Sequence, residues 1–335
     1  MLMSTVVLPE SFSASHFADP TYHLNMEVLL RGIDTNGLIL IDAEESLYHQ
    51  MCDQIEPLAT VGKGKTTHAL FEELLKKRRQ KIVRFVKTEC SFNSNCKSSD
   101  MASSIATKCK ADSLLTDTAH YAELKSATNG SVEVIPITEF IGSRTEAERR
   151  GCVESLPSLD QMASGDFNRL MVGATRFSRW LRFYDKQIGK GTGLSRFRKG
   201  MEKILRAWTD AAHFPIDQLS IDLYTVIDES QYKQFEPSVA YFRVKGDLID
   251  PLQQQFGIPI KLSVKRDPDS KCHPRHLQTQ SLSILFEKGF DILEDDGSLC
   301  RTFITAGGNF NTHLQEFRQL PEYLPPQPTG VAGRP

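Results

Sequence analysis

Short apolar runs alternate with helical patterns along the N-terminal half of the chain. Strands are predicted where apolar residues stand together, and helices where they recur every three or four positions. The predicted strands are residues 38–41, 81–86, 113–116 and 132–137, and the predicted helices are 46–55, 69–79, 105–110 and 119–127. Strands that alternate with helices predict a parallel sheet flanked by helices.

The C-terminal half shows the same alternation. Its predicted strands are residues 182–184, 221–227, 260–264 and 282–286. A helix is predicted over 195–212, behind Ser195, because Ser is a typical N-capping residue. Its apolar stripe consists of Phe197, Met201, Ile204, Leu205 and Trp208. We therefore expect a second α/β unit, again built on a mainly parallel sheet.

The length of 335 residues favours two domains, at about 150 residues per domain. The predicted divisions are an N-terminal extension (1–20), a first α/β domain (21–142), a linker (143–166), a second α/β domain (167–318) and a Pro-rich tail (319–335).

Composition excludes several protein classes. With 40 Lys and Arg against 42 Asp and Glu, the chain is neither histone-like nor wholly acidic, and 40% hydrophobic residues exclude general disorder. No apolar run is long enough to span a bilayer and the N-terminus lacks a signal-peptide pattern, so we expect a cytoplasmic protein. Seven Cys without a CxxC pair indicate reduced thiols.

Basic residues gather in the second half. Residues 165–212 carry 11 Lys and Arg against four Asp and Glu. Clustered cations of this kind favour a polyanionic partner. Arg182, Arg198 and Lys199 are the predicted phosphate-binding residues. An anionic membrane surface stays open as an alternative to nucleic acid.

Three carboxylates of the first half lie at predicted strand ends. Asp42 follows residues 38–41, and Asp112 and Asp117 bracket residues 113–116. Carboxylates that converge at one edge of a parallel sheet provide the oxygen ligands of Mg²⁺ or Mn²⁺. We expect such a metal site here. The alternative is that these Asp residues cap helices and turns.

Residues 24–140 resemble PIN-like nuclease domains. The resemblance rests on Asp42 at the end of a strand and on the later Ala111-Asp112-x-x-x-Thr116 segment with Asp117 beside the Thr. It implies a metal-dependent nuclease, with Asp42, Asp112 and Asp117 as the metal ligands.

Residues 170–310 resemble the single-motif phospholipase-D-like domains, as in MIT-domain proteins that bind membranes. In His273-Pro274-Arg275, the His aligns with the histidine of the HxK(x)4D motif and Arg275 aligns with its lysine. The resemblance implies that a His attacks phosphorus while a second His protonates the leaving group. Because this chain has one such motif, a complete site would require a homodimer.

The two halves of the predicted phosphate site are far apart in the sequence. We expect Asp185, Lys186, His273 and Arg275 to line one concave site, with Arg182 pointing into it. Arg275 is suited to a bidentate phosphate contact. The alternative is a structural His beside an Arg–Asp pair.

These observations predict a phosphodiester-binding, nuclease-like protein that acts on nucleic acid, either DNA or RNA, and analogy suggests prokaryotic defence. The alternative is an inert module for phosphate or phospholipid recognition, or for assembly. The sequence does not place stacking aromatic residues beside the basic segment, so it gives no support for single-strand binding.

Overall fold

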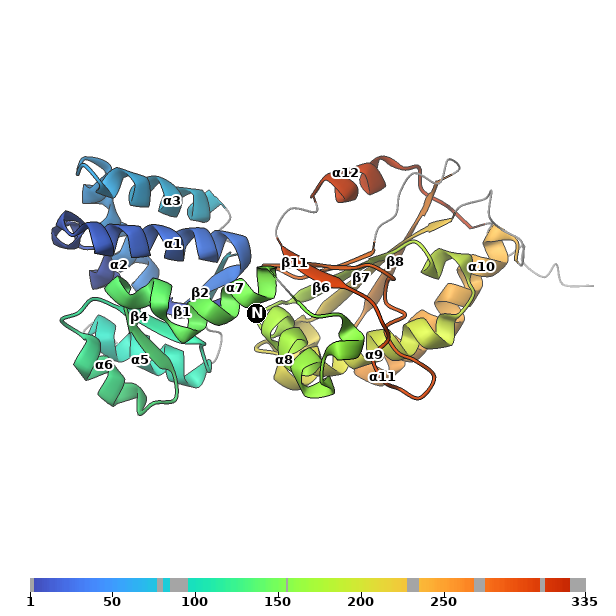
Figure 1. The fold of residues 1–335 in the computed structure, drawn as a ribbon. Helices are drawn as coiled ribbons and strands as arrows, with labels where there is room; N and C mark the ends of the chain where they lie inside the picture. The colour runs from blue at the N-terminus through green and yellow to red at the C-terminus, as the bar shows by residue number, and fades with distance from the viewer. Residues whose placement is uncertain are drawn as a thin grey trace, which may run out of the picture.

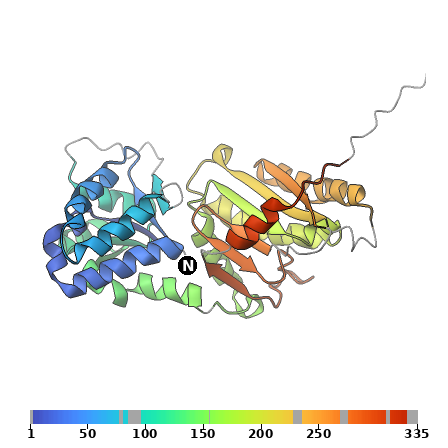
Figure 2. The ribbon, with the colours of Figure 1, turned by 90° about the horizontal axis from the view of Figure 1, so that it is seen from above.

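The computed structural model describes residues 3–76, 81–84, 96–154, 156–227, 235–267, 275–307 and 311–325. These residues form two α/β units, each a sheet with its helices, and the two units lie side by side (Figures 1 and 2). The N-terminal half builds a five-stranded sheet and the C-terminal half a six-stranded sheet. The predicted α/β class is confirmed.

The five-stranded sheet is entirely parallel, in the order β3-β2-β1-β4-β5. Its strands are β1 (Met3–Val7), β2 (Gly37–Ile41), β3 (Ile82–Arg84), β4 (Ser113–Thr116) and β5 (Glu133–Pro136). The helices of this half are α1 (Pro20–Asn36), α2 (Ser46–Ile55), α3 (Gly64–Lys76), α5 (Ser98–Lys108) and α6 (Tyr121–Thr128). Figure 1 shows α1 and α3 on one side of the sheet and α5 and α6 on the other.

The prediction of an N-terminal extension over residues 1–20 is wrong. Met3–Val7 forms β1, the central strand of the sheet, and all five of its residues are buried. A strand covered on both faces shows no alternation of polar and apolar residues, and five residues are too few to stand out in the sequence. Asp42 therefore follows the second strand, and the acidic residue after the first strand is Glu10.

The predicted linker over residues 143–166 contains a helix, α7 (Arg144–Glu154). Its Glu146 is buried and accepts hydrogen bonds from Arg149, at 2.6 and 2.8 Å. Arg149 also donates to the Asn36 side chain at 2.9 Å. The charges that suggested an exposed linker thus attach α7 to the end of α1.

The six-stranded sheet is mixed, which corrects the prediction of a mainly parallel one. Its order is β11-β10-β9-β6-β7-β8; among the described strands the β6–β7 and β7–β8 pairs are parallel, and the other three pairs are antiparallel. The strands are β6 (Trp180–Asp185), β7 (Ser220–Ile227), β8 (Ile260–Arg266), β9 (Arg275–Gln278), β10 (Ser283–Phe286) and β11 (Ile304–Gly307). The turn between β9 and β10 is too short for a parallel crossover, so these strands pair as a hairpin.

Helices lie on both faces of this sheet. They are α8 (Ser164–Thr175), α9 (Leu194–Ala211), α10 (Pro237–Arg243), α11 (Asp250–Phe256) and α12 (Asn311–Gln319). Figure 1 shows α8, α9 and α11 below the sheet and α12 above it. No helix within the described ranges is both long enough and apolar enough to cross a bilayer.

Helix α9 confirms the predicted helix over residues 195–212 and its apolar stripe. Phe197, Met201, Ile204, Leu205 and Trp208 are all buried. The helix begins one residue earlier than predicted, and its N-cap is Gly193, at φ 64°, rather than Ser195. Glycine fits there because a positive φ is costly for residues with a Cβ.

The two faces of the six-stranded sheet differ in polarity. Leu181 and Phe183 of β6 are buried in the main core, whereas Arg182 and Tyr184 belong to the opposite face, because successive side chains of a strand alternate. Tyr184 packs edge-on against Phe317 of α12, with ring centroids 5.7 Å apart. The polar face of the sheet therefore faces α12.

The chain continues from α12 along the free edge of β8. Pro321 accepts a hydrogen bond from Arg266 at 2.8 Å, and Tyr323 donates to Val264 at 2.9 Å. The beginning of the predicted tail (319–335) is thus paired with the sheet, while residues 326–335 lie outside the described residues.

Candidate functional site

Asp42 caps a helix, as its alternative interpretation predicted. It is fully buried after β2, where its two carboxylate oxygens accept hydrogen bonds from the amides of Ser46 and Leu47 at 2.7 and 2.8 Å. These are first-turn amides of α2, which have no partner within the helix itself. The carboxylate of Asp42 is therefore occupied by the backbone.

Asp112 lies at the amino ends of the parallel strands, whereas Asp42 and Asp117 lie at their carboxyl ends. It precedes β4, and it accepts hydrogen bonds from the Ser4 amide at 2.8 Å and from Arg176, the C-cap residue of α8, at 3.0 Å. Asp112 and Asp117 bracket β4, so the length of the strand separates them. The predicted convergence of three carboxylates is wrong for this reason. Among the described residues, no group of three His, Cys, Asp or Glu side chains is arranged to hold a metal ion.

Asp117 is placed at the carboxyl edge of the sheet, as predicted, and its neighbours are two histidines. Its carboxylate lies 2.8 and 3.0 Å from Nδ1 of His120, and it also accepts the His120 amide at 2.9 Å. On the other side, Nε2 of His16 lies 3.7 Å from its Oδ2. The Asp-x-x-His spacing was visible in the sequence, but His16 lies about a hundred positions away and only the fold brings it here.

An aromatic ring packs against the distal histidine. Tyr22 of α1 stacks on His16, with centroids 4.9 Å apart and planes inclined by 22°, and it donates a hydrogen bond to the Ser11 carbonyl at 2.6 Å. Burial, and to a smaller extent the charge of Asp117, raises the pKa of the Tyr22 hydroxyl above its usual range. Tyr22 therefore remains a neutral hydrogen-bond donor and keeps the His16 ring in place.

In the C-terminal half, the structure brings Asp185 and Arg275 together. They are directly opposite each other on the antiparallel strands β6 and β9. Asp185 is fully buried and accepts the amides of Gln187 at 2.7 Å and Phe290 at 3.0 Å. Burial raises the pKa of Asp185 to about 6, although these hydrogen bonds and Arg275 oppose the shift. Asp185 is thus a buried support of the turn around Phe290.

The other members of the predicted phosphate site are placed differently. Lys186 is buried, Arg275 donates to the Glu287 carbonyl, and His273 lies outside the described residues. The prediction that Arg182 points into this site is wrong, because side chains alternate along β6 and Asp185 lies on the face opposite to Arg182. Arg182 instead pairs with Asp222 at 3.2 Å and stacks over Trp180.

The predicted basic surface of α9 is partly paired. Arg198 lies 3.6 Å from Glu202 and 3.5 Å from the Asp247 carbonyl. Lys203 donates to Ser164 at 3.0 Å. Lys199 is exposed. Arg198 and Lys203 therefore attach this helix to neighbouring segments.

A polar cavity opens on the α12 side of the six-stranded sheet, beside β8. Its volume is about 470 Å³. Its aromatic walls are Tyr224, Tyr241, Phe317 and Tyr323, and its cations are Lys261, Lys265 and Arg318. Tyr224, Tyr241 and Tyr323 are half-buried, so each ring is both held by the protein and open to solvent. These residues come from four elements and span a hundred positions in the sequence, and the sequence alone did not group them.

Tyr224 lines this cavity and stacks on Tyr184, which is buried and does not line it. The rings of Tyr184 and Tyr224 lie 4.5 Å apart with planes 8° from parallel, and Phe317 packs edge-on against both. Burial, and next the proximity of Tyr224, raises the pKa of Tyr184 to about 12, whereas Arg182 and Arg318 lower it. Both the raised pKa of Tyr184 and the ring packing make this stack a rigid, uncharged support for the Tyr224 wall of the cavity.

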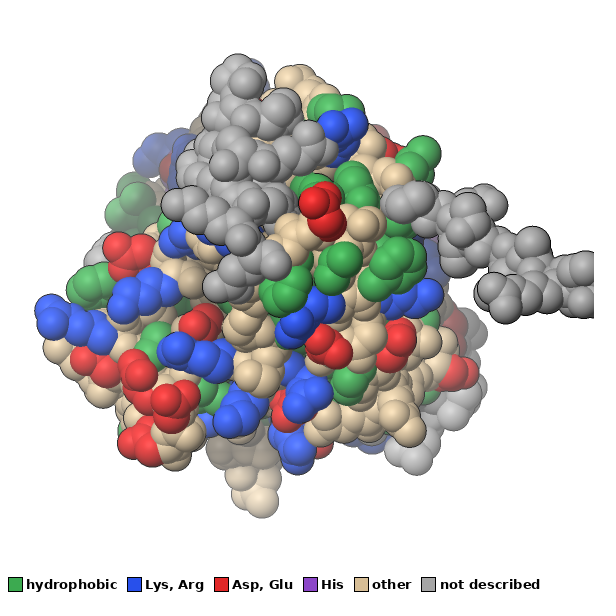
Figure 3. Space-filling view, turned by 90° about the vertical axis from the view of Figure 1, so that its right-hand side faces the viewer, with side chains coloured by type: hydrophobic (Ala, Val, Ile, Leu, Met, Phe, Trp, Pro, Cys, Tyr) green, Lys and Arg blue, Asp and Glu red, His purple; other side chains and the backbone are tan. Residues whose placement is uncertain are grey.

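The charges around the cavity favour an anionic ligand. Lys265 pairs with Glu322 at 3.4 Å, and Asp222 pairs with Arg182. The other cations that line the cavity are Lys261 and Arg318, and Arg318 forms a side-chain hydrogen bond with Tyr184. Figure 3 looks onto this end of the C-terminal half and shows hydrophobic side chains interspersed with charged ones. Val239, Phe242 and Leu324 are exposed apolar residues from the same segments as the cavity walls.

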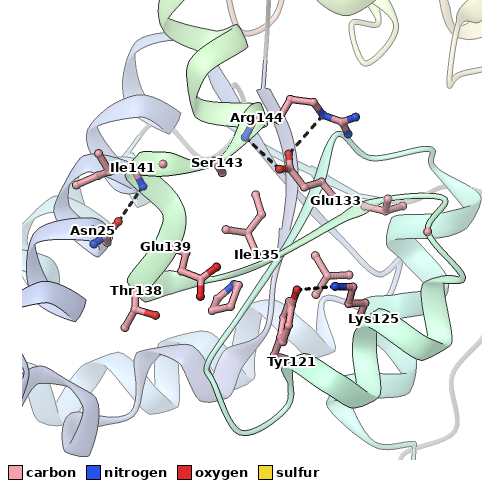
Figure 4. Close-up of a pocket in the computed structure, with 15 residues that line it drawn as sticks. Asn25, Tyr121, Lys125, Glu133, Ile135, Thr138, Glu139, Ile141, Ser143 and Arg144 are labelled. Carbon is pink, nitrogen blue, oxygen red and sulfur yellow. Dashed lines mark hydrogen bonds and ion pairs between the residues drawn. The ribbon is translucent and has the colours of Figure 1, made fainter.

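A second cavity, of about 740 Å³, follows the edge strand β5 of the other sheet (Figure 4). Its polar side chains are engaged with each other and with the backbone. Lys125 donates to Tyr121 at 3.0 Å, Asn25 accepts the Ile141 amide at 2.8 Å, and Glu133 accepts the Arg144 amide at 3.1 Å. These contacts hold its walls together, so the cavity beside β8 is the stronger candidate for ligand binding.

Comparisons with known proteins give no match to this chain, whether with family models, with curated proteins or with solved structures.

Proposed function

We propose that this protein binds single-stranded nucleic acid in the cavity beside β8. The observation that carries the proposal is the gathering of three half-buried tyrosines and three cations around one cavity of about 470 Å³. Bases stack on aromatic side chains without regard to sequence, while cations contact the phosphates. The cavity provides both kinds of contact.

The roles of the individual residues follow from their placement. Tyr241 and Tyr323 lie with ring centroids 6.1 Å apart, so a base stacks against one of them at the mouth of the cavity. Lys261 and Arg318 bind the phosphate, since Lys265 already pairs with Glu322. The volume is within the range of about 300–1,000 Å³ that is common for ligand pockets.

The PIN-like resemblance of the first half and the phospholipase-D-like resemblance of the second half are part of this proposal. A parallel sheet with acidic residues after β1, β2 and β4 supports the PIN-like assignment of the first half. The pairing of Asp185 with Arg275 across β6 and β9 supports the phospholipase-D-like assignment of the second. Both families act on phosphodiesters, which agrees with a nucleic-acid ligand.

The experiment is fluorescence anisotropy of labelled single-stranded oligonucleotides, with duplex DNA as a competitor. We expect Tyr241→Ala to weaken binding about 5- to 150-fold, because stacking contributes about 1–3 kcal/mol per base. Lys261→Gln is expected to lower the slope of log K against log salt by about 0.7, the value of one phosphate contact to a single strand.

Tyr121→Ala and Lys125→Gln, which change a half-buried Tyr and an exposed Lys of the other half, are the matched controls. Both are expected to bind like the wild type. If Tyr241→Ala and Lys261→Gln also bind like the wild type, the proposed site is wrong. Binding to anionic lipid vesicles but to no oligonucleotide would overturn the proposal in favour of a phospholipid-recognition module.

A further inference from the structure

The five-stranded sheet has a second polar site, where its strand order reverses. From β1 the chain moves outward through β2 to β3, and it then returns to place β4 and β5 on the other side of β1. The carboxyl ends of β1 and β4 therefore flank the crevice at which open α/β sheets bind their ligands. Glu10 follows β1 and Asp117 follows β4.

Asp117 and its two histidines stand at this crevice. The side chain of Asp117 is 4% exposed, whereas those of His16 and His120 are 29% and 35% exposed. The carboxylate thus lies behind two imidazoles that solvent reaches. Because Asp117 accepts from Nδ1 of His120, Nε2 of that ring is left as a proton acceptor.

Further polar atoms at this edge lack hydrogen-bond partners. Within the described residues, the buried Oγ1 of Thr116 and Oε2 of Glu10 have none. The other oxygen of Glu10, Oε1, accepts a hydrogen bond from Ser98. Buried polar atoms are normally paired, so an unpaired hydroxyl and one unpaired carboxylate oxygen next to the crevice indicate a site that a polar ligand completes.

We propose that His16 and His120 form an acid–base pair that cleaves RNA, with Asp117 as the residue that positions both. This inference rests on the proposed binding of nucleic acid for its class of substrate. RNA fits two imidazoles because its own 2′-hydroxyl is the nucleophile, so the protein has only to accept one proton and donate another.

The step balances without a further reactant. Nε2 of His120 takes the proton of the 2′-hydroxyl, and the 2′-oxygen forms a bond to phosphorus. The bond from phosphorus to the 5′-oxygen breaks, and protonated His16 gives its proton to that oxygen. The products are a 2′,3′-cyclic phosphate and a 5′-hydroxyl. Asp117 stabilises the positive charge that forms on His120, and Tyr22 keeps the His16 ring stacked.

The test incubates the full chain with a labelled single-stranded RNA in EDTA, and with DNA of the same sequence. We expect cleavage of the RNA alone, products that end in a 2′,3′-cyclic phosphate, and a bell-shaped pH profile, because one imidazole must be neutral and the other protonated. His120→Ala and His16→Ala are each expected to lower the rate about a hundredfold or more. Asp117→Asn is expected to lower it and to change the pH profile, which a purely structural residue would not do.

His49→Ala removes an exposed His of α2 and is the matched control, with the wild-type rate expected. Anisotropy with the same RNA, measured on every variant, separates the two proposals. Unchanged binding with lost cleavage supports the acid–base pair. Binding without cleavage by the wild type, equal cleavage of DNA, or full activity of His120→Ala overturns it. If no oligonucleotide binds, the proposed function is wrong. Incubation with a dinucleotide of RNA at high concentration then tests whether His16 and His120 cleave RNA, and an uncleaved dinucleotide overturns the acid–base pair as well.

Discussion

Replacing Gly289 with Ala tests the role of Asp185 in the C-terminal half. Gly289 has φ +79° and is buried in the turn after β10, where its amide donates to the Phe286 carbonyl at 3.0 Å. A methyl group on its Cα would overlap Oδ2 of Asp185 and would lie 3.0 Å from Cγ. The same oxygen accepts the Phe290 amide, so the substitution displaces a buried carboxylate from its donor.

The expected loss of stability is the sum of two effects. An Ala at positive φ costs about 1–2 kcal/mol. Displacing Asp185 leaves the Phe290 amide or the carboxylate unsatisfied, which costs about 1–3 kcal/mol more. We therefore expect Gly289→Ala to lower the free energy of unfolding by about 2–5 kcal/mol, from these two contributions.

Urea unfolding followed by tryptophan fluorescence measures this effect in the C-terminal half. The chain has two Trp residues, and both belong to this half, Trp180 in β6 and Trp208 in α9. Trp208 is fully buried and donates to the Ser178 carbonyl at 3.1 Å, so its emission changes when the core opens.

Gly297→Ala is the matched control for backbone strain. Gly297 has φ +85°, but nothing lies within 4 Å of the position of its added methyl group. Gly297→Ala is therefore expected to lower the free energy of unfolding only by the cost of an Ala at positive φ, about 1–2 kcal/mol. Equal losses for the two variants would refute the reasoning that Asp185 is held by the turn at Gly289.

Two further predictions concern buried carboxylates. Since burial raises the pKa of Asp185 from 3.8 to about 6, its protonated form stabilises the folded state below about pH 4, and this contribution is lost as the pH rises through 6. The free energy of unfolding, measured with urea, is expected to fall by about 3 kcal/mol over this pH range, and Asp185→Asn is expected to remove this pH dependence. The same pH dependence in the variant would contradict the assignment of the raised pKa to Asp185. Asp42→Ala is expected to destabilise α2 by about 1–2 kcal/mol and to speed hydrogen exchange of its first-turn amides, whereas unchanged exchange would show that the cap is dispensable.

The sequence determined those helices and strands whose apolar residues follow a regular spacing within one segment. The apolar stripe from Phe197 to Trp208 is complete within one helix, so its spacing alone located α9. The strands after β1 in the first half were located from apolar runs for the same reason. Met3–Val7 was missed because a central strand shows no alternation, and the antiparallel part of the second sheet was missed because strand direction depends on pairing.

The candidate sites are formed by contacts between residues that are far apart in the sequence. Of the predicted carboxylates, Asp117 has half-exposed histidines as neighbours, while Asp42 caps a helix and Asp112 pairs with Arg176. A strand end is visible in a sequence, but which oxygen accepts which donor is decided only when the strands and helices pack. Asp185 and Arg275, which the sequence analysis assigned to one site, lie opposite each other on the paired strands β6 and β9.

What the sequence by itself determined about this protein is its α/β class and the helix α9, since period and capping are properties of neighbouring residues. Tertiary structure alone decided the grouping of Tyr224, Tyr241 and Tyr323 around one cavity and of His16 with His120 around Asp117. These residues share no local pattern. They meet because strand order and sheet direction bring the ends of distant segments to one place, and that order is fixed by burial and hydrogen bonding of the whole chain.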